Sequence, residues 1–375
     1  MMEYDIAVVG GGPAGMMAAI AAKSSDVILL EKNPSLGRKL LLTGGGRCNI
    51  TNLKPTKKLL SHYNNPNFLK HSFYTFTNEM LLSLFKDKGL DFTVEDNDRV
   101  FPKTHKSGDV LEILESYLGD VTVKCNFNVK SISDDFIIND TIQASKIIIT
   151  TGGVTYPSTG CAFDNYSLTP HKITPINYGL APMITADDVS AISGIVLEDV
   201  KVRGVRGNVL ITHFGLTGPV ILDISNDFTH DLKIDLLPDM SHDVLTRDFL
   251  NAHGKMHLKN FLKKYMPKNF IKYFMGKCGV SDVLMSNLRK KDRNKIIEYL
   301  KLFPFEIKGV CKNLSKITVG GVDTDFVNPK TMESKIIDNL YFAGETLNLH
   351  GPTGGYNLKL AFSTGYLAGL SAAKR

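Results

Sequence analysis

The sequence predicts an α/β protein in which a β-rich segment and then a helical segment interrupt a parallel-sheet domain. Three observations lead to this fold class. A short apolar run with a glycine-rich turn opens the chain at 4–15, and a second such pair, followed by a helical pattern, closes it at 340–373. Short strand-like runs fill the chain from about 180 to 237, and from 241 to 302 the apolar spacing becomes helical.

The elements follow from local apolar patterns. Short apolar runs bounded by glycine or polar residues predict buried strands at 4–9, 27–30, 146–150 and 340–342. Apolar residues at helical spacing predict helices at 13–23, 78–88 and 357–373. The remaining predicted strands are short ones within 121–138, then 200–202, 209–212, 220–224, 232–236, 305–310 and 316–319.

This order of elements predicts three parts. Both chain ends, 1–180 and 321–375, form one nucleotide-binding domain, and 181–238 with 304–320 form an inserted β-rich domain. Residues 239–303 form a helical subdomain within that insertion. A length of 375 residues, 43% hydrophobic and 22% charged, is ordinary for globular proteins and argues against disorder and coiled coil.

Cysteine usage and the N-terminus indicate a cytoplasmic protein. The five cysteines form no CxxC pair, which argues against a zinc ribbon, a disulfide scaffold and a redox-active dithiol. Residues 6–22 carry no charge, but glycines and a proline interrupt them and no basic segment precedes them, unlike a signal peptide. His253 and His257 lack the glutamate of a zincin, so no metal site is predicted.

Positive charge is concentrated in the helical segment. Residues 253–301 hold thirteen Lys and Arg against three acids, whereas the whole chain has a net charge of only +6. Such a basic block is typical of a protein that binds a polyanion such as RNA. A solvated helical face in a lysine-rich chain would look the same, so both interpretations stay open.

The first turn carries a dinucleotide-binding pattern. Residues 10–15 read Gly-Gly-Gly-Pro-Ala-Gly and fit G-x-G-x-x-G, between a predicted strand and a predicted helix. Gly10 permits a tight turn, Gly12 lets the backbone approach a pyrophosphate, and Gly15 lets the helix pack on the strand. Glu31 ends the next strand, close to the expected distance of about 20 residues, and is placed to bind ribose hydroxyls.

Three further glycine-rich clusters follow predicted strands. They are 43–49 (TGGGRCN), 150–153 (TTGG), and 344–345 with 351–357 (GE and GPTGGYN). Glycines bring backbone close to a flat or anionic ligand, and Arg47 is able to pair with a phosphate or a ring carbonyl. A glycine-rich helix start at 351–357 offers N–H groups to negative charge.

Together these segments resemble the bacterial flavoprotein family related to BaiN and YhiN, known as NAD(P)/FAD-dependent or aminoacetone oxidases. The matching segments are GGGPAGMMAA, GRKLLLTGGGRCNITN, DRVFP, TGGVTYPSTG, THFGLTGP, ITVGGVDT, KTMESK and LYFAGETLNLHGPTGGYNLKLAFSTG. They cover nearly the whole chain. The resemblance implies a Rossmann-type FAD-binding domain like that of glutathione reductase, an inserted β-barrel-like domain and a small helical domain.

The resemblance also implies where FAD is bound. The expected cofactor-binding residues are Gly10, Gly12, Pro13, Ala14, Gly15, Glu31, Lys32, Lys39, Thr43, Gly45, Gly46, Arg47, Cys48, Asn49, Val129, Thr151, Gly152, Gly153, Gly344, Glu345, Thr353, Gly354, Gly355, Tyr356 and Asn357. Tyr156, Thr217 and the loop around His350 are expected near the isoalloxazine face. Cys161 to Asn165 and Asn348 depart from the family pattern close to the expected ligand.

Flavin enzymes that move a hydride often need one proton donor from the protein. The candidate catalytic residues are Cys48, Tyr156 and His350, each of which has a purely structural alternative. With only one dinucleotide fingerprint, either NAD(P)H docks transiently against the flavin as electron donor or another reductant serves. The resemblance implies reduction of conjugated double bonds, oxidation of small amines, or reduction of uridine in ribosomal RNA.

The basic block favours ribosomal RNA as the partner, because phosphate contacts dominate such affinity. A small-molecule ene-reductase or amine oxidase is the second hypothesis. A non-catalytic flavin redox sensor or RNA-binding protein is the third.

Overall fold

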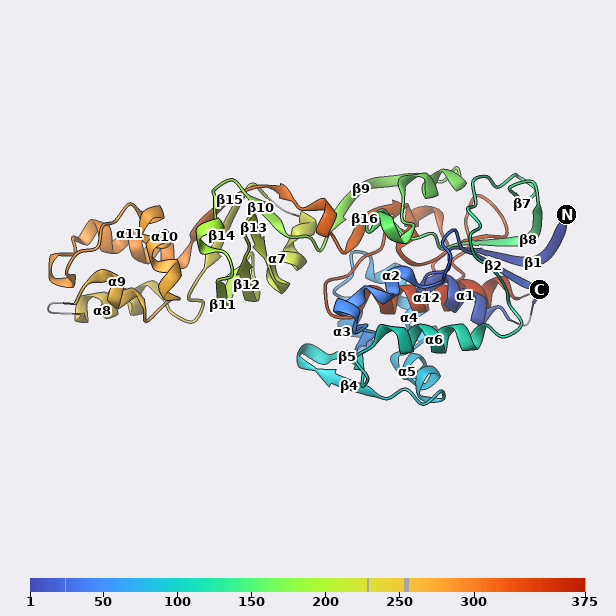
Figure 1. Ribbon diagram of the computed structural model, residues 1–375, viewed down its shortest axis with the longest axis horizontal. Coiled ribbons are helices and arrows are strands. Elements are labelled where there is room, and N and C mark those ends of the chain that lie inside the picture. The colour runs from blue at the N-terminus through green and yellow to red at the C-terminus, as the bar shows by residue number, and fades with distance from the viewer. Residues whose placement is uncertain (24, 228, 253–255, 375) are drawn as a thin grey trace. The chain divides into compact units, whose positions relative to one another are not determined.

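Figure 1 shows the computed structural model, which describes all residues except 24, 228, 253–255 and 375. The chain forms two compact units: Met1–Tyr178 with Lys316–Arg375, and Gly179–Ser315. The chain returns to the first unit at Lys316, before the position 321 that the sequence suggested. The reason is that β16 (Ile317–Val322) pairs with β9 (Ile173–Gly179) in a two-stranded sheet.

The first unit is built on a mostly parallel sheet with the order β17-β8-β1-β2-β6. Apolar runs form its central strands and are buried on both faces, as parallel sheets require. The strands are β1 (Met2–Val9), β2 (Val27–Leu30), β6 (Thr122–Lys124), β8 (Ile142–Ile149) and β17 (Leu340–Phe342), with β7 (Ile137–Ile138) antiparallel to β8. The predicted α/β fold class is therefore confirmed, although the strand expected at 146–150 begins earlier, at Ile142.

Two helices from opposite ends of the chain pack closely in this unit (Figure 1). They are α1 (Pro13–Ala21) and α12 (Tyr356–Ala372). A Cβ atom on Gly365 or Gly369 would lie 2.2 or 2.1 Å from a backbone oxygen of α1. Glycines at these positions therefore let the two backbones touch, and the packing joins the chain ends in one domain.

A small antiparallel sheet and further helices complete the first unit. The sheet has the order β3-β5-β4, from Thr51–Asn52, Arg99–Pro102 and Phe92–Glu95. The helices are α2 (Arg38–Leu41), α3 (Thr56–Leu60), α4 (Pro66–Thr75), α5 (Asn78–Lys86) and α6 (Ser107–Leu118). Of the strands expected within 121–138, only β6 and β7 form.

The second unit contains a closed six-stranded barrel with the order β10-β13-β12-β11-β14-β15. Its strands are Met183–Thr185, Gly215–Thr217, Val205–Ile211, Val196–Val202, Asp231–Asp235 and Phe303–Val310. Helices α8 (His242–Asn251), α9 (Leu258–Leu262), α10 (Lys268–Cys278) and α11 (Lys290–Lys301) follow β14. Barrel and helices share one hydrophobic cluster.

One predicted strand of this unit is wrong. Residues 220–224 belong to the helix α7 (Pro219–Ile224). Gly218 adopts a φ of 103°, which favours glycine, and Pro219 stands at the first helical position, where its missing N–H costs nothing. Four apolar residues and one Asp in a five-residue segment show no period that separates a strand from a helix, so the capping residues decide.

Candidate functional site

Four turns that are far apart in the chain meet at one edge of the parallel sheet. Val9 pairs with Leu30 and Ile149, and Ile149 pairs with Phe342. The parallel strands therefore end together, and the segments after them lie side by side: 10–15, Glu31, 150–153 and 343–345. This carboxyl edge is where ligands bind in open α/β sheets.

The three motif glycines of the first turn have different physical roles. A Cβ on Gly10, whose φ is 109°, would lie 2.5 Å from the Thr150 carbonyl oxygen. A Cβ on Gly15 would lie 1.8 Å from the Gly10 carbonyl oxygen. Gly12 has an ordinary φ of −79°, and a Cβ there would meet no described atom within 4 Å. Gly10 and Gly15 thus serve packing, whereas Gly12 faces open space that a ligand could fill.

Glu31 holds this turn together from the end of β2. Its buried carboxylate accepts hydrogen bonds from the Gly11 N–H at 2.7 Å, the Asn33 N–H at 2.8 Å and the Asn33 amide at 2.6 Å. A carboxylate offers about four acceptor sites, so one remains for a ribose hydroxyl. The ribose contact stays a prediction that this geometry allows.

A partly buried ion pair joins two of the expected cofactor-binding residues. The Lys39 ammonium donates to Glu345 Oε2 at 2.5 Å and to Thr155 Oγ1 at 2.7 Å. Burial is the largest single influence and opposes the lysine charge, but Glu345 together with Cys161 and Tyr156 outweighs it, and the pKa of Lys39 is raised. Glu345 Oε1 also accepts from the Thr318 N–H at 2.6 Å. Lys39 is thus held as a cation beside the sheet edge.

Thr318 was not predicted as a site residue, although it closes one side of this cluster. A Cβ on Gly153 would lie 2.0 Å from Thr318 Oγ1, and the Val154 N–H donates to the same oxygen at 2.8 Å. Thr318 lies far away in sequence, and only the pairing of β16 brings it here. In the sequence, only the glycine at 153 indicated that another side chain packs closely against this segment.

The segment after β8 contains a buried polar atom without a hydrogen-bond partner among the described residues. The Gly152 N–H donates to Thr346 Oγ1 at 3.0 Å. The neighbouring Thr151 Oγ1 is buried and has no hydrogen-bond partner among the described residues. Cys161 lies next to Gly152 and is buried, in the loop where the chain departs from the family pattern.

The glycine-rich loop after α2 is open to solvent. Gly45 and Gly46 have φ values of 69° and 86°, and a Cβ on either would meet no described atom within 4 Å. The Asn49 amide, in its hydrogen-bonded orientation, accepts from the Gly355 N–H at 3.1 Å. This contact ties the loop to the loop before α12.

Arg47 is engaged with protein groups in this loop. Its guanidinium pairs with Glu95 at 2.6 Å and lies 4.2 Å from the Phe101 ring centre. A phosphate or ring carbonyl would have to compete with Glu95 for it. Contact between Arg47 and a cofactor therefore stays a prediction.

The loop before α12 is closed by its own residues. Asn357 Oδ1 accepts from the Gly351 N–H at 2.9 Å, and its Nδ2 donates to the Gly351 carbonyl at 3.0 Å. Gly354 and Gly355 have φ values of 105° and 94°. Tyr63 Oη donates to the Tyr356 carbonyl at 2.8 Å. The loop is thus rigid before any ligand binds.

The three candidate proton donors differ in access. Cys48 is 0% exposed, and burial raises its pKa to about 12, which argues against proton donation to a substrate. Tyr156 is half-buried with a φ of 57°, and the ammonium groups of Lys39 and Lys316 lie 5.8 and 5.5 Å from its ring centre. His350 is half-buried, and its backbone N–H donates to Asn64 Oδ1 at 2.8 Å. Tyr156 and His350 keep their candidate roles.

The other predicted residues are placed as follows. Lys32 donates to Asn165 Oδ1 at 3.4 Å, and Thr43 Oγ1 donates to the Leu40 carbonyl at 2.7 Å. Val129 packs against the core of the first unit, and Thr217 ends β13 in the second unit. Pro13 and Ala14 begin α1, and Gly344 has a φ of 71° directly after β17. Thr353 is half-buried in the loop before α12.

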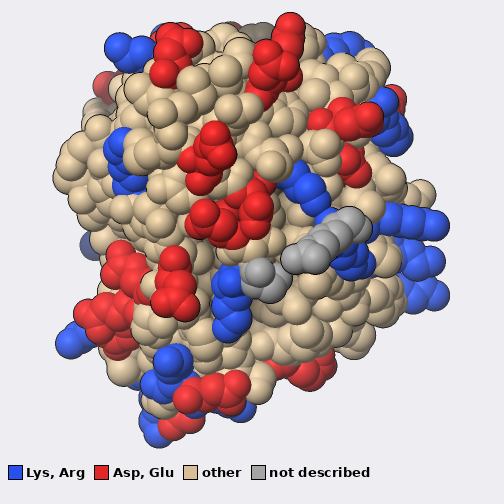
Figure 2. Space-filling view, turned by 90° about the vertical axis from the view of Figure 1, so that its right-hand side faces the viewer, with Lys and Arg blue, Asp and Glu red and all other residues tan. Residues whose placement is uncertain are grey.

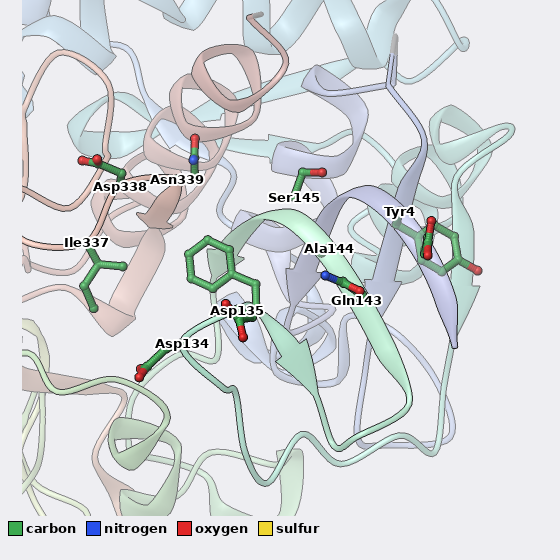
Figure 3. A pocket seen from close by; sticks show the side chains of 11 residues that line it. Tyr4, Asp134, Asp135, Gln143, Ala144, Ser145, Ile337, Asp338 and Asn339 are labelled. Atoms are coloured by element: carbon green, nitrogen blue, oxygen red, sulfur yellow. The ribbon is translucent and has the colours of Figure 1, made fainter.

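A hollow of about 610 Å³ lies at the opposite, amino edge of the sheet (Figure 3). It is lined by the first residues of β1 and β8 and by the residues just before β17. Its carboxylates are Glu3, Asp134, Asp135 and Asp338. Figure 2 faces the end of the first unit that carries the termini and shows several acidic patches there. An anionic dinucleotide would be repelled at this hollow, so it is not the candidate site.

The basic helical block of the second unit is partly neutralised. Five of its cations pair with carboxylates: Lys259 with Asp282, Lys264 with Asp248, Lys277 with Asp187, Arg289 with Asp292 and Lys301 with Asp235. Three of these acids lie outside 253–301, so the segment count overstates the local charge. Exposed lysines without an ion pair among the described residues are Lys263, Lys268, Lys272, Lys290, Lys291 and Lys295. Lys255 lies outside the described residues.

The aromatic residues of this block mostly belong to the core. Phe270 and Phe274 are 0% exposed, and Phe261 is buried. They pack against Phe249 and Phe303 rather than forming a platform for bases. The block therefore offers charge but little stacking surface to a nucleic acid.

The described residues contain neither a helix able to cross a membrane nor a metal-binding group of side chains. No described helix has both the length and the apolar character that crossing a membrane requires. No group of three or more metal-ligating side chains occurs in the described part of the chain, and His253 lies outside that part.

These features fit a bound FAD. The open space at Gly12 lies at the start of α1, where N–H groups and the helix dipole favour a pyrophosphate. The buried Thr151 hydroxyl at the same sheet edge needs a polar neighbour that the described residues do not provide. The residues that would hold FAD are therefore Gly12, Glu31, Lys39, Thr151 and the loops at 43–49 and 351–357.

The chain is similar to known proteins over nearly its whole length. The family model of the HI0933-like protein Rossmann domain matches residues 4–371. A ribosomal RNA dihydrouridine synthase of Haemophilus influenzae is 29% identical, with 100% of both chains covered. A 3-dehydro-bile acid Δ(4,6)-reductase of Clostridium scindens is 30% identical, with 99% of both chains covered.

A solved structure supports the fold alone. A quinol-fumarate reductase with menaquinol molecules has a TM-score of 0.50 at 14% identity, covering 99% of this chain and 71% of that chain. The chain belongs to the HI0933-like Rossmann-domain family, and it is an FAD-dependent oxidoreductase.

Proposed function

We propose that this protein reduces a uridine of ribosomal RNA to dihydrouridine, with NAD(P)H as electron donor. The observation that carries the proposal is the match, over the full length of both chains, to a relative named for this reaction. The helical block has six exposed lysines that form no ion pair among the described residues. These lysines are available to contact the phosphates of a polyanion. We place the reaction in the cytoplasm, where ribosomes work.

The chemistry that the relatives' names describe narrows the reaction further. One name denotes a uridine reduction and the other a reduction of double bonds in a bile acid ketone. In uridine the C5=C6 bond is conjugated to the C4 carbonyl. Reduction therefore adds a hydride at C6 and a proton at C5. The proposed reaction class is reduction of a carbonyl-conjugated double bond.

When bound, FAD supplies the hydride. The protein must orient the base and supply the proton. Tyr156 and His350 are the candidate donors, because both are partly exposed beside the expected site. The Lys39 ammonium is held at the same sheet edge by Glu345 and Thr155.

A small-molecule ene-reductase is the second candidate, supported by the relative named as a bile acid reductase. Amine oxidation and a non-catalytic redox role are further alternatives. Under the small-molecule alternatives, charge on the helical block would have no part in substrate binding, whereas a non-catalytic RNA-binding protein would still use it.

The test compares ribosomal RNA from a deletion strain and from the same strain carrying the gene. Loss of dihydrouridine on deletion, measured by nucleoside mass spectrometry, and its return on complementation are expected. The purified protein should be yellow and should bleach with NADH or NADPH without oxygen. Unchanged dihydrouridine in the deletion strain, together with turnover of small enones, would overturn the RNA substrate.

A further inference from the structure

A second basic segment lies in the first unit. Residues 32–78 contain eight Lys and Arg and no Asp or Glu. This segment includes the glycine-rich loop at 43–49, the helix α3 and the helix α4. The absence of acids over such a length means that these cations can be neutralised only by carboxylates from elsewhere in the chain.

The part of this segment around α3 is attached to the loop before α12. The His62 ring meets the Tyr356 ring edge-on, with 5.3 Å between centres. Tyr63 Oη donates to the Tyr356 carbonyl, and Asn64 exchanges hydrogen bonds with the backbone of His350. The end of α3 therefore lies directly beside the loop expected at the isoalloxazine.

Most cations of the segment already have partners. Lys39 pairs with Glu345, and Arg47 pairs with Glu95. Lys54 lies 3.5 Å from Asp98 and donates to the Asn97 carbonyl at 3.0 Å. Glu345 offsets the charge of Lys39, and the β4–β5 hairpin supplies the acids that offset Arg47 and Lys54.

Lys57 and Lys58 differ from these three. Both are exposed on α3, and neither has an ion pair among the described residues. The charges of Lys54 and Lys58 reach His62, whose pKa is lowered by burial and then by these two lysines. The α3 segment that leads to His62 and Tyr356 thus carries two exposed ammonium groups without ion pairs among the described residues, and an exposed imidazole whose pKa is lowered.

We propose that Lys57, Lys58 and His62 form a phosphodiester-binding surface that positions the RNA strand at the reactive site. The two ammonium groups hold the phosphates that flank the target nucleotide, and the imidazole contacts a neighbouring base or sugar. This inference rests on the proposed RNA substrate and gives it a contact in the first unit, separate from the helical block.

The charge argument favours a polyanion over a small substrate. A neutral enone gains nothing from two adjacent ammonium groups, whereas each phosphate contact releases condensed counterions. Phosphate contacts also fix the register of a nucleic acid, which base contacts alone do weakly. A surface next to the reacting base is where such register matters most.

The test uses the whole protein with bound FAD and a uridine-containing single-stranded RNA. Lys57→Gln with Lys58→Gln is compared with Lys23→Gln with Lys130→Gln, which removes the same charge. Lys23 and Lys130 are exposed and lie toward the amino edge of the sheet. Dissociation constants are measured by fluorescence anisotropy over a series of salt concentrations.

The expected result is a several-fold weaker affinity for the Lys57/Lys58 variant. Its slope of log K against log salt should fall by up to roughly 1.4, since each phosphate contact on a single strand contributes about 0.7. The control variant should keep the wild-type slope. Flavin absorbance and melting temperature of both variants report an intact fold.

The outcomes separate this inference from the proposed function. If both double variants bind RNA equally well, the surface at α3 is wrong while RNA as substrate stands. His62→Ala should then also have no effect on affinity or turnover. If the wild-type protein binds no RNA at low salt and the deletion strain keeps its dihydrouridine, the inference and the proposed function both fail.

Discussion

Gly12 and Gly15 stand in the same turn, yet a methyl group at the two positions should act on different properties. At Gly15 it would overlap the Gly10 carbonyl, so Gly15→Ala should lower the melting temperature of the protein with or without FAD. At Gly12 it would meet no described atom, so Gly12→Ala should leave the apoprotein stable and weaken FAD binding. Calorimetry and visible absorbance measure the two effects.

The two glycine variants serve as controls for each other. FAD-free protein must be used for the stability comparison, because a ligand that binds only the folded state raises the melting temperature by itself. If Gly12→Ala destabilises the apoprotein as much as Gly15→Ala, the open space at Gly12 does not belong to a ligand. If the Gly12→Ala variant retains full FAD affinity, the pyrophosphate does not bind at Gly12.

At the scale of elements, one contact between α12 and α4 contains an unusual buried charge. Lys359 is 1% exposed, and its ammonium donates to the Phe76 carbonyl at 2.6 Å, close to the rings of Phe73 and Phe76. Burial lowers the pKa of Lys359 to about 7, and the charge of Glu79 opposes this only weakly. Above about pH 7 the folded protein therefore favours the neutral amine.

This contact predicts a pH dependence of stability. Between about pH 7 and the ordinary lysine pKa of 10.5, the unfolded chain binds a proton that the folded chain does not. The free energy of unfolding should therefore rise with pH across this window, by up to roughly 4 kcal/mol at 1.36 kcal/mol per pKa unit. Below pH 7 the penalty is fully present.

Lys359→Met tests this dependence, because methionine fills a similar volume without a charge. Chemical unfolding at pH 7 and pH 10 should show a gain in stability for the wild type and a much smaller one for the variant. The Phe76 carbonyl also accepts a hydrogen bond from Ser363 Oγ at 3.4 Å, so replacing the lysine should leave this carbonyl with one donor. Equal pH dependence of the two proteins would show that Lys359 is not the titrating group.

Local pattern was enough for those elements whose partners are close in sequence or whose caps are distinctive. The strand β1, the turn at 10–15, the strand β2 and Glu31 were all predicted, because their spacing is set by one compact motif. The helix α7 was missed, because only Gly218 and Pro219 distinguish it from a strand. Thr318, Glu95 and His62 were missed as well, since sheet pairing and loop packing bring them to the site from distant segments.

At the scale of the whole molecule, charge counted along the sequence differs from charge arranged in space. The segment 253–301 carries the largest excess, but acids at 187, 235 and 248 approach it and pair with its lysines. The acid-free segment 32–78 has fewer cations, yet two of them, on α3, are exposed and form no ion pair within the described part of the chain. Basic segments therefore have to be judged by their unpaired members.

This distinction predicts how two sets of lysines contribute to RNA affinity. Replacing Lys263, Lys290 and Lys291 by glutamine removes three charges without an ion pair, whereas replacing Lys264, Lys277 and Lys301 removes three paired ones. Both changes alter the net charge equally. If RNA contacts the helical block, the first triple variant should lose more affinity and more of its salt dependence, since those lysines are free to meet phosphates. Equal losses would mean that only long-range net charge matters, and no loss in either would remove the helical block from the binding surface.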